Sequence, residues 1–138
     1  MTETFTKEER AAMRELAKER KANESRAEAL AACLAKIDAM HPDDKAIALA
    51  IHELALKVNP NFEVKTWYGM PGYFIDGKII LFFQDGHKFK TRYCTLGFQD
   101  AANLDDGDIW PTSFAVQVVN SKVSAEISRL IEKAVASR

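Results

Sequence analysis

Three aspartates stand close together in a stretch that has no basic residue, and their carboxylates are candidates for metal binding. They are Asp105, Asp106 and Asp108, within the segment 99–112. Carboxylate oxygens are ligands for hard cations and for iron(II). Aspartates also close turns, because their side chains accept hydrogen bonds from nearby backbone N–H groups. We therefore carry two interpretations of this loop: a metal site with iron as its ion, and a set of turn residues.

A thiol and an imidazole lie seven positions apart, at Cys94 and His87. On one regular strand an odd separation places the two side chains on opposite faces, where they cannot act as a nucleophile and its base. The sequence also has no GxSxG elbow and no glycine-rich phosphate loop. We expect Cys94 to be a small buried side chain, and the signals of an enzyme are missing.

Aromatic and cationic side chains are concentrated between Trp67 and Trp110. A pocket at the end of a sheet would combine apolar walls with a few polar groups. The residues that we assign to this predicted ligand site are Trp67, Tyr68, Met70, Lys90, Arg92, Tyr93 and Trp110. The alternative is that most of these aromatics fill the layer between a sheet and its helices.

The N-terminal part of the chain is predicted to be helical. Thr6 with Glu9 fits a capping box, which predicts a charged, solvated helix over 7–21. The residues from Asn23 to Ser25 are expected to break that helix. We therefore divide the chain into a charged helical arm, residues 1–23, and a single domain, residues 24–138.

Two further helices are predicted before the sheet. Leu30, Cys33, Leu34 and Ile37 recur at the spacing of a core-facing stripe. That helix ends before Pro42, since the residue before a proline is disfavoured in helical conformation. The next helix runs to about residue 58, and the two should form an antiparallel hairpin packed on the sheet.

The middle of the chain predicts an antiparallel meander. Asp76-Gly77 is the strongest hairpin signal, because both residues tolerate a positive φ. We expect strands over 62–68, 73–75, 78–84, 88–98 and 114–119, then a closing helix over 124–136. The predicted fold is α+β, a two-layer sandwich in which about five strands pack against helices, with an extra N-terminal helix.

Composition excludes several classes of protein. Hydrophobic residues make up 47% of the 138 residues, which is typical of a globular chain. The net charge of −1, from 19 basic and 20 acidic residues, argues against a general binder of nucleic acid or of membrane surfaces. The charged first 21 residues do not resemble a signal peptide. We expect a cytoplasmic protein.

Three segments resemble the YdhG-like bacterial domain of unknown function. They read KTWYGMPGYFIDGKIILFFQ, KFKTRYCTLGF and ANLDDGDIWPTSFAV, and the resemblance extends from about Leu30 to Val135. It implies a compact α+β domain with helices on one side of an antiparallel sheet, and no established enzymatic activity. One branch of that family is described as frataxin-like intracellular iron chaperones, which makes iron handling a hypothesis for this chain.

The leading hypothesis is therefore a binding protein that handles iron through Asp105, Asp106 and Asp108 and passes it to a metal-receiving protein. A second hypothesis is a domain that binds a small molecule in the aromatic pocket. A third is an interaction module that forms a homodimer through the sheet or the N-terminal helix.

Overall fold

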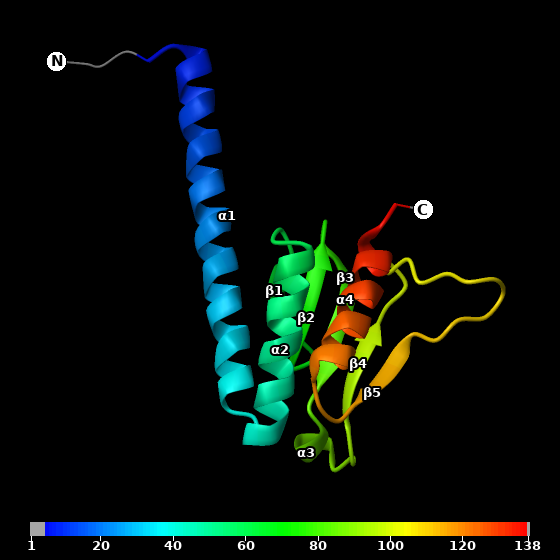
Figure 1. Cartoon of the computed structure of the whole chain (residues 1–138). Helices are drawn as coiled ribbons and strands as arrows, with labels where there is room; N and C mark the ends of the chain where they lie inside the picture. The colour runs from blue at the N-terminus through cyan, green and yellow to red at the C-terminus, as the bar shows by residue number, and fades with distance from the viewer. Residues whose placement is uncertain (1–4, 138) are drawn as a thin grey trace.

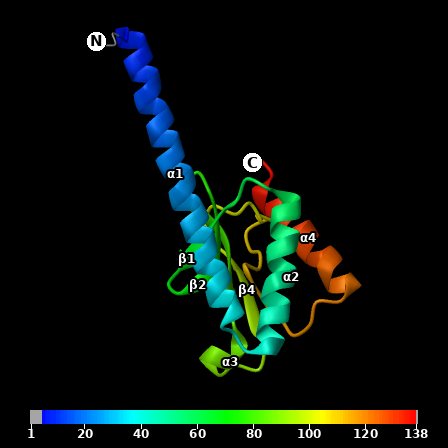
Figure 2. The ribbon, with the colours of Figure 1, turned by 90° about the vertical axis from the view of Figure 1, so that its left-hand side faces the viewer.

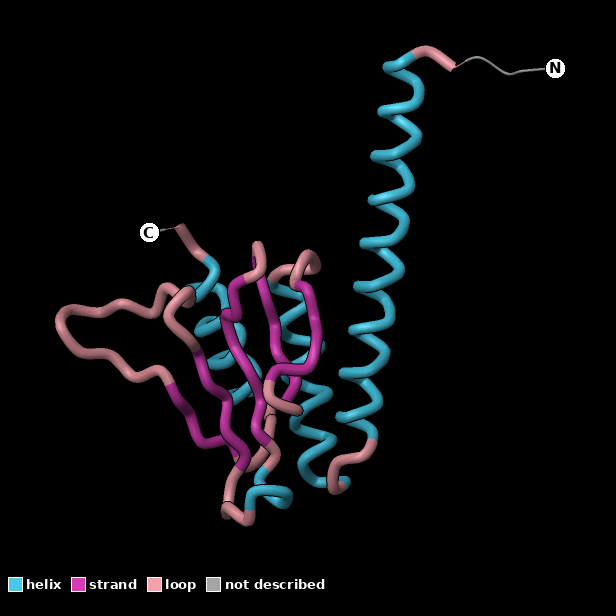
Figure 3. Tube along the Cα trace, turned by 180° about the vertical axis from the view of Figure 1, so that it is seen from behind, coloured by secondary structure: helices cyan, strands magenta, loops and turns pink. Residues whose placement is uncertain are grey.

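The computed structural model describes residues 5–137 and packs a five-stranded sheet against a layer of helices (Figure 1). The elements are α1 (Lys7–Asp38), α2 (Pro42–Val58), β1 (Glu63–Trp67), β2 (Met70–Ile75), β3 (Lys78–Gln84), α3 (Gly86–Phe89), β4 (Cys94–Phe98), β5 (Ser113–Val116) and α4 (Ser121–Val135). The strands pair antiparallel in chain order. Seen from behind, the sheet stands in front of α2 and α4, which cover its other face (Figure 3). The predicted α+β meander is confirmed.

α1 is one continuous helix of 32 residues, so the predicted break from Asn23 to Ser25 is wrong. Its start agrees with the prediction, since the Thr6 hydroxyl accepts a hydrogen bond from Glu9 N at 3.0 Å. Asparagine and serine cost only about 0.5 kcal/mol each relative to alanine inside a helix. No proline or glycine occurs before Pro42, so no strong helix breaker interrupts α1 before it ends at Asp38.

α2 begins at Pro42, which suits the first helical position because its missing N–H would have no helical partner. His41 caps this helix, with Nδ1 accepting a hydrogen bond from Asp43 N at 3.2 Å. The core between helices and sheet is made of large, fully buried side chains, among them Ile37, Ile51, Tyr73, Leu81, Phe83, Leu96 and Ile131.

Two tight turns organise the first three strands. Asp76 and Gly77 both have positive φ, at 50° and 77°, as the hairpin signal predicted. Tyr68 and Gly69 repeat this conformation between β1 and β2, at 49° and 77°. Turns with two positive φ values match the twist of the flanking strands, so they fix the pairing register of the meander.

The predicted strand over 88–98 is wrong in its first half. Residues Gly86–Phe89 form the short helix α3, and β4 begins only at Cys94. Lys90 takes a left-handed conformation with φ of 56°, which ends α3 and turns the chain back. His87 and Cys94 therefore do not share a strand, so strand alternation does not put their side chains on opposite faces. β5 also ends at Val116, before the predicted residue 119.

His52 of α2 and Tyr73 of β2 form a polar contact between helix and sheet, with 2.9 Å between Nδ1 and the phenol oxygen. Tyr73 is 1% exposed, and burial raises its pKa far above the ordinary value. Burial also lowers the pKa of His52, against a smaller opposing effect of the Glu53 charge. Both partners are thus neutral at neutral pH.

We expect this pair to make the protein less stable in mild acid. The unfolded chain takes up a proton on His52 near pH 6.5, whereas the folded chain does so only at lower pH, so protonation favours unfolding. A His52→Gln variant keeps a hydrogen-bonding group without the titration. Between about pH 7.5 and about pH 5 its free energy of unfolding, measured by urea denaturation, should fall less than that of the native chain. Parallel curves for the two proteins would contradict this.

Candidate metal centre

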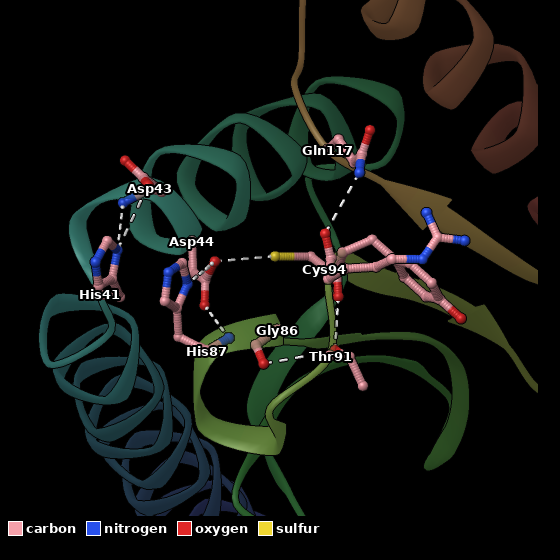
Figure 4. A network of polar contacts seen from close by, with 10 residues as sticks. His41, Asp43, Asp44, Gly86, His87, Thr91, Cys94 and Gln117 are labelled. Carbon is pink, nitrogen blue, oxygen red and sulfur yellow. Dashed lines mark hydrogen bonds and ion pairs between the residues drawn. The ribbon is translucent and has the colours of Figure 1, made fainter.

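The site is built around Asp44, a carboxylate in the first turn of α2 that is 3% exposed. It accepts three hydrogen bonds from other parts of the chain (Figure 4). Two come from His87, through the backbone N at 2.8 Å and the ring Nδ1 at 2.9 Å, and one comes from Cys94 Sγ at 3.3 Å. Asp44 therefore ties α2 to α3 and to the first residue of β4.

The charge of Asp44 sets the tautomer of His87. Burial raises the pKa of Asp44, but the hydrogen bonds from His87 and Cys94 outweigh it and hold the pKa below the usual aspartate range. An ionised carboxylate only accepts hydrogen bonds, so the proton of the neutral His87 ring is on Nδ1. The lone pair of that ring is then on Nε2, where it can bind a metal ion.

Cys94 takes part as a donor and not as a nucleophile. Burial raises the pKa of its thiol to about 11, with smaller upward effects from Asp44 and Asp85. The thiol therefore keeps its proton at neutral pH, whereas nucleophilic attack and metal ligation need the thiolate. This agrees with the prediction of a small, buried and inert Cys94.

The turn that contains α3 holds His87 in place. Thr91 N donates to Gly86 O at 3.0 Å, and the Thr91 hydroxyl donates to Tyr93 O at 2.8 Å. Gly86 itself is buried against this backbone. The tightly wound segment leaves His87 with its Nδ1 toward Asp44 and with a side chain that is 51% exposed.

His41, from the junction of α1 and α2, stacks on His87. The two ring centroids are 3.6 Å apart and the planes differ by 2°. In the part of the chain that the structure describes, His41, Asp43 and His87 are the group that could hold a metal ion, with one ligand atom of each within 4.8 Å of the others. All three side chains are open to solvent. Two imidazoles and a carboxylate are a ligand set for iron(II) or zinc.

His41 must change its hydrogen bonding to bind an ion. Its Nδ1 accepts the capping hydrogen bond from Asp43 N and lies 3.8 Å from the Asp43 carboxylate. Ligation through Nδ1 would take over that lone pair, and ligation through Nε2 would put the proton on Nδ1. Either way the cap of α2 is lost, which costs about 1 kcal/mol.

A pocket of about 250 Å³ lies beside these residues, and Asp44, His87, Cys94 and Gln117 line it. A groove of about 400 Å³ between β5 and α4 shares Arg92 and Tyr93 with this pocket. Two residues of the predicted ligand site therefore do lie next to the candidate metal centre.

The other predicted ligand residues lie elsewhere. Trp67 packs on Phe82 of β3, with ring centroids 5.0 Å apart, and Tyr68 is 84% exposed in the turn after β1. Trp110 lines a different pocket together with Phe98. Met70 begins β2, and Lys90 is exposed in the turn after α3. The structure thus does not bring the seven residues into one aromatic pocket.

The three aspartates of the long loop are all exposed. Among the described residues, Asp105, Asp106 and Asp108 do not form a group whose ligand atoms approach one another within 4.8 Å. Asp105 lines the same pocket as Trp110. This geometry gives no support to the loop as the metal site.

Sequence reasoning missed the His41–Asp43–His87 cluster because His87 is 46 positions from His41 and 44 from Asp43 in the sequence. A local signal did exist at His41, since a histidine directly before a proline at a helix start is placed to cap the helix. In the sequence, Asp43 and Asp44 look alike, since both are acidic residues at the start of the helix after Pro42, where negative charge suits the helix dipole. Whether Asp43 or Asp44 is buried depends on tertiary packing, which helical periodicity alone does not determine.

The comparisons with known proteins add no identification: no family model matches the chain, and neither a curated protein nor a solved structure is significantly similar to it. The resemblance to the YdhG-like domain stays a prediction. None of the described helices is both long and apolar enough to cross a membrane.

Proposed function

We propose that this protein binds a divalent transition-metal ion reversibly at His41, Asp43 and His87, with iron(II) as the ion that it carries. The observation that supports this most is the bond from His87 Nδ1 to the buried Asp44 at 2.9 Å. A carboxylate in this position fixes the ring and makes the other nitrogen a better ligand, an arrangement typical of metal-binding histidines. His41 and Asp43 supply the further ligands next to it once the His41 ring turns out of its parallel stack on His87, so that the in-plane lone pairs of both rings reach one ion.

The ligand types favour iron(II) as cargo. Two histidines and one carboxylate leave several coordination positions open, as in non-haem iron(II) sites. Water or the ligands of a receiving protein can fill those positions. The same set also accommodates zinc, so selectivity would depend on which ion is supplied.

The site is suited to exchange. Its three ligands are on the surface, so an ion can enter and leave without the chain opening. The loss of the α2 cap opposes binding and keeps the affinity moderate. Moderate affinity with open positions is what a protein needs if it delivers an ion to another protein.

Anaerobic calorimetric titration with iron(II) tests the proposal. The native chain should bind one ion, and His87→Ala should weaken the affinity by at least about tenfold, with a similar loss in His41→Ala. The matched control changes Asp105, Asp106 and Asp108 together to asparagine and should bind like the native chain. Circular dichroism verifies that each variant is folded at the temperature of titration.

Two results would contradict the proposal. One is the absence of any binding of iron(II) or zinc(II) by the native chain. The other is a loss of affinity in the triple asparagine variant while His87→Ala binds normally, because that result would return the site to the long loop.

A further inference from the structure

The first two thirds of α1 extend away from the domain, and within this segment the Arg26 guanidinium donates a hydrogen bond to Asn61 O at 3.4 Å. All described residues up to Glu28 are exposed, and Ala29 and Leu30 are the first that are partly covered. Figures 1 and 2 show this segment extending far beyond the rest of the molecule. The helical residues 7–28, which we call the arm, span about 33 Å at 1.5 Å per residue. Most of the stability of helices in proteins comes from packing of an apolar face, and the exposed residues of the arm have little such packing within their own chain.

The arm has a seam that continues the face packed on the domain, with apolar side chains at Ala27, Leu16 and Met13 and polar ones at Asn23 and Arg20. Ile37, Leu34, Leu30, Ala27, Asn23, Arg20, Leu16 and Met13 follow one another at alternating steps of three and four. This is the spacing of a coiled-coil seam. Ile37 is buried in the core, whereas Leu16 is 46% exposed and Met13 is 50% exposed. Phe5, at the tip of the arm, is 40% exposed.

A site that can accept the apolar side chain at the tip of a second arm lies where the arm meets the domain. A pocket of about 190 Å³ lies beside α1 at this point, and its lining includes Leu30, Leu56, Phe62 and Val64. It is on the seam side of α1, since Leu30 belongs to both. A helix that runs along the seam toward the domain would therefore end at this pocket.

We propose that two copies of the chain form a dimer in which their arms pair antiparallel along this seam. The Phe5 of each copy then enters the pocket at Leu30 of the other. This self-association is independent of the metal site, because His41 lies at the opposite end of α1 from the tip.

Steric fit selects the antiparallel direction. From Leu30 onward the seam is covered by the chain's own β1 and β2, which pack against α1. In a parallel pair, the helix and domain of the second copy would lie beside the same part of α1 and would collide with β1 and β2 of the first copy. An antiparallel partner ends there with its tip, and its domain lies beyond the far end of the first arm.

The charges select the same direction. Glu9 continues the seam toward the tip, because it stands four residues before Met13. Near the domain the seam side has Arg26, which also lines the pocket. Antiparallel arms bring Glu9 beside Arg26 of the second copy, and parallel arms would place Glu9 beside Glu9 and Arg26 beside Arg26.

Sedimentation velocity of the full chain tests the association, and we expect a dimer. Leu16→Glu puts a charge in the middle of the seam and should give a monomer with an intact domain by circular dichroism. Lys18→Glu, about 160° around the helix from Leu16, is the matched control and should remain dimeric. A native chain that is monomeric at high concentration, or a Leu16→Glu variant that stays dimeric, would overturn the proposal.

Disulfide cross-linking tests the direction. In a Phe5→Cys/Ala27→Cys variant the two thiols of one chain are about 33 Å apart, so a bond between these positions must join two copies. We expect efficient covalent dimers from this variant and few from Phe5→Cys/Ala32→Cys, in which the second thiol is on the far side of the helix. Efficient dimers from Phe5→Cys alone would show parallel arms and overturn the antiparallel assignment.

Discussion

Replacing Asp44 by alanine should lower the free energy of unfolding by about 3 kcal/mol, the cost of removing one partner from a buried, charged hydrogen-bond network. Alanine leaves His87 N and the buried Cys94 Sγ without their acceptor. The measurement is urea denaturation near neutral pH. Asp43→Ala is the control next to it, because the Asp43 side chain is 79% exposed, and its effect should stay within about 0.5 kcal/mol.

The Asp44→Ala variant also tests the second role of Asp44, which is to orient the His87 ring for metal binding. Without the carboxylate the His87 ring loses its orientation, so affinity for iron(II) should fall about 10- to 100-fold. In acid the stability difference from the native chain should shrink. The pKa of Asp44 is lowered on folding, so its contribution is present above the ordinary aspartate pKa and disappears as the pH falls through the lower folded value. A difference below about 1 kcal/mol at neutral pH would contradict the assigned role of Asp44.

Replacing Gly86 by alanine should be about as damaging, at about 3 kcal/mol. The added Cβ would lie 2.6 Å from Tyr93 O and 3.2 Å from Thr91 O. Both are backbone atoms of the turn that α3 begins, so the overlap can be relieved only by moving the segment that carries His87. Weaker metal binding should therefore accompany the loss of stability in this variant.

Gly107→Ala is the informative control for this substitution. Gly107 has a positive φ of 67° but no atom within 4 Å of its added Cβ, so alanine there should cost only about 1 kcal/mol of backbone strain. Urea denaturation of both variants gives the comparison. A Gly86→Ala variant no less stable than Gly107→Ala would show that α3 can move freely.

The sequence was sufficient for the parts of the fold that local chemistry determines. Asp76-Gly77 required two positive φ values, Thr6 and Glu9 marked a helix start, and Pro42 ended one helix and opened the next. Each of these signals acts through the residue's own backbone or through neighbours a few positions away. The meander order followed from them.

The sequence failed where two structures were locally acceptable. Asn23 to Ser25 can end a helix or continue one, and residues 88–93 have the alternation of a strand although the structure places them at the end of α3 and in the turn after it. The predicted aromatic pocket failed for a related reason. Cross-strand pairing puts Phe82 opposite Gly97, so the ring of Phe82 lies over that glycine and beside Trp67. The candidate metal centre joins residues from α2 and α3 that only the tertiary fold brings together.

The most direct test of the metal site is the anomalous diffraction of a crystal soaked anaerobically with iron(II). We predict one strong peak at bonding distance, about 2 Å, from His87 Nε2, with His41 and Asp43 around it. His87 Nδ1 should still bond to Asp44 in that crystal. A peak among Asp105, Asp106 and Asp108 instead, or no peak at His87 in a fully soaked crystal, would contradict the proposed site.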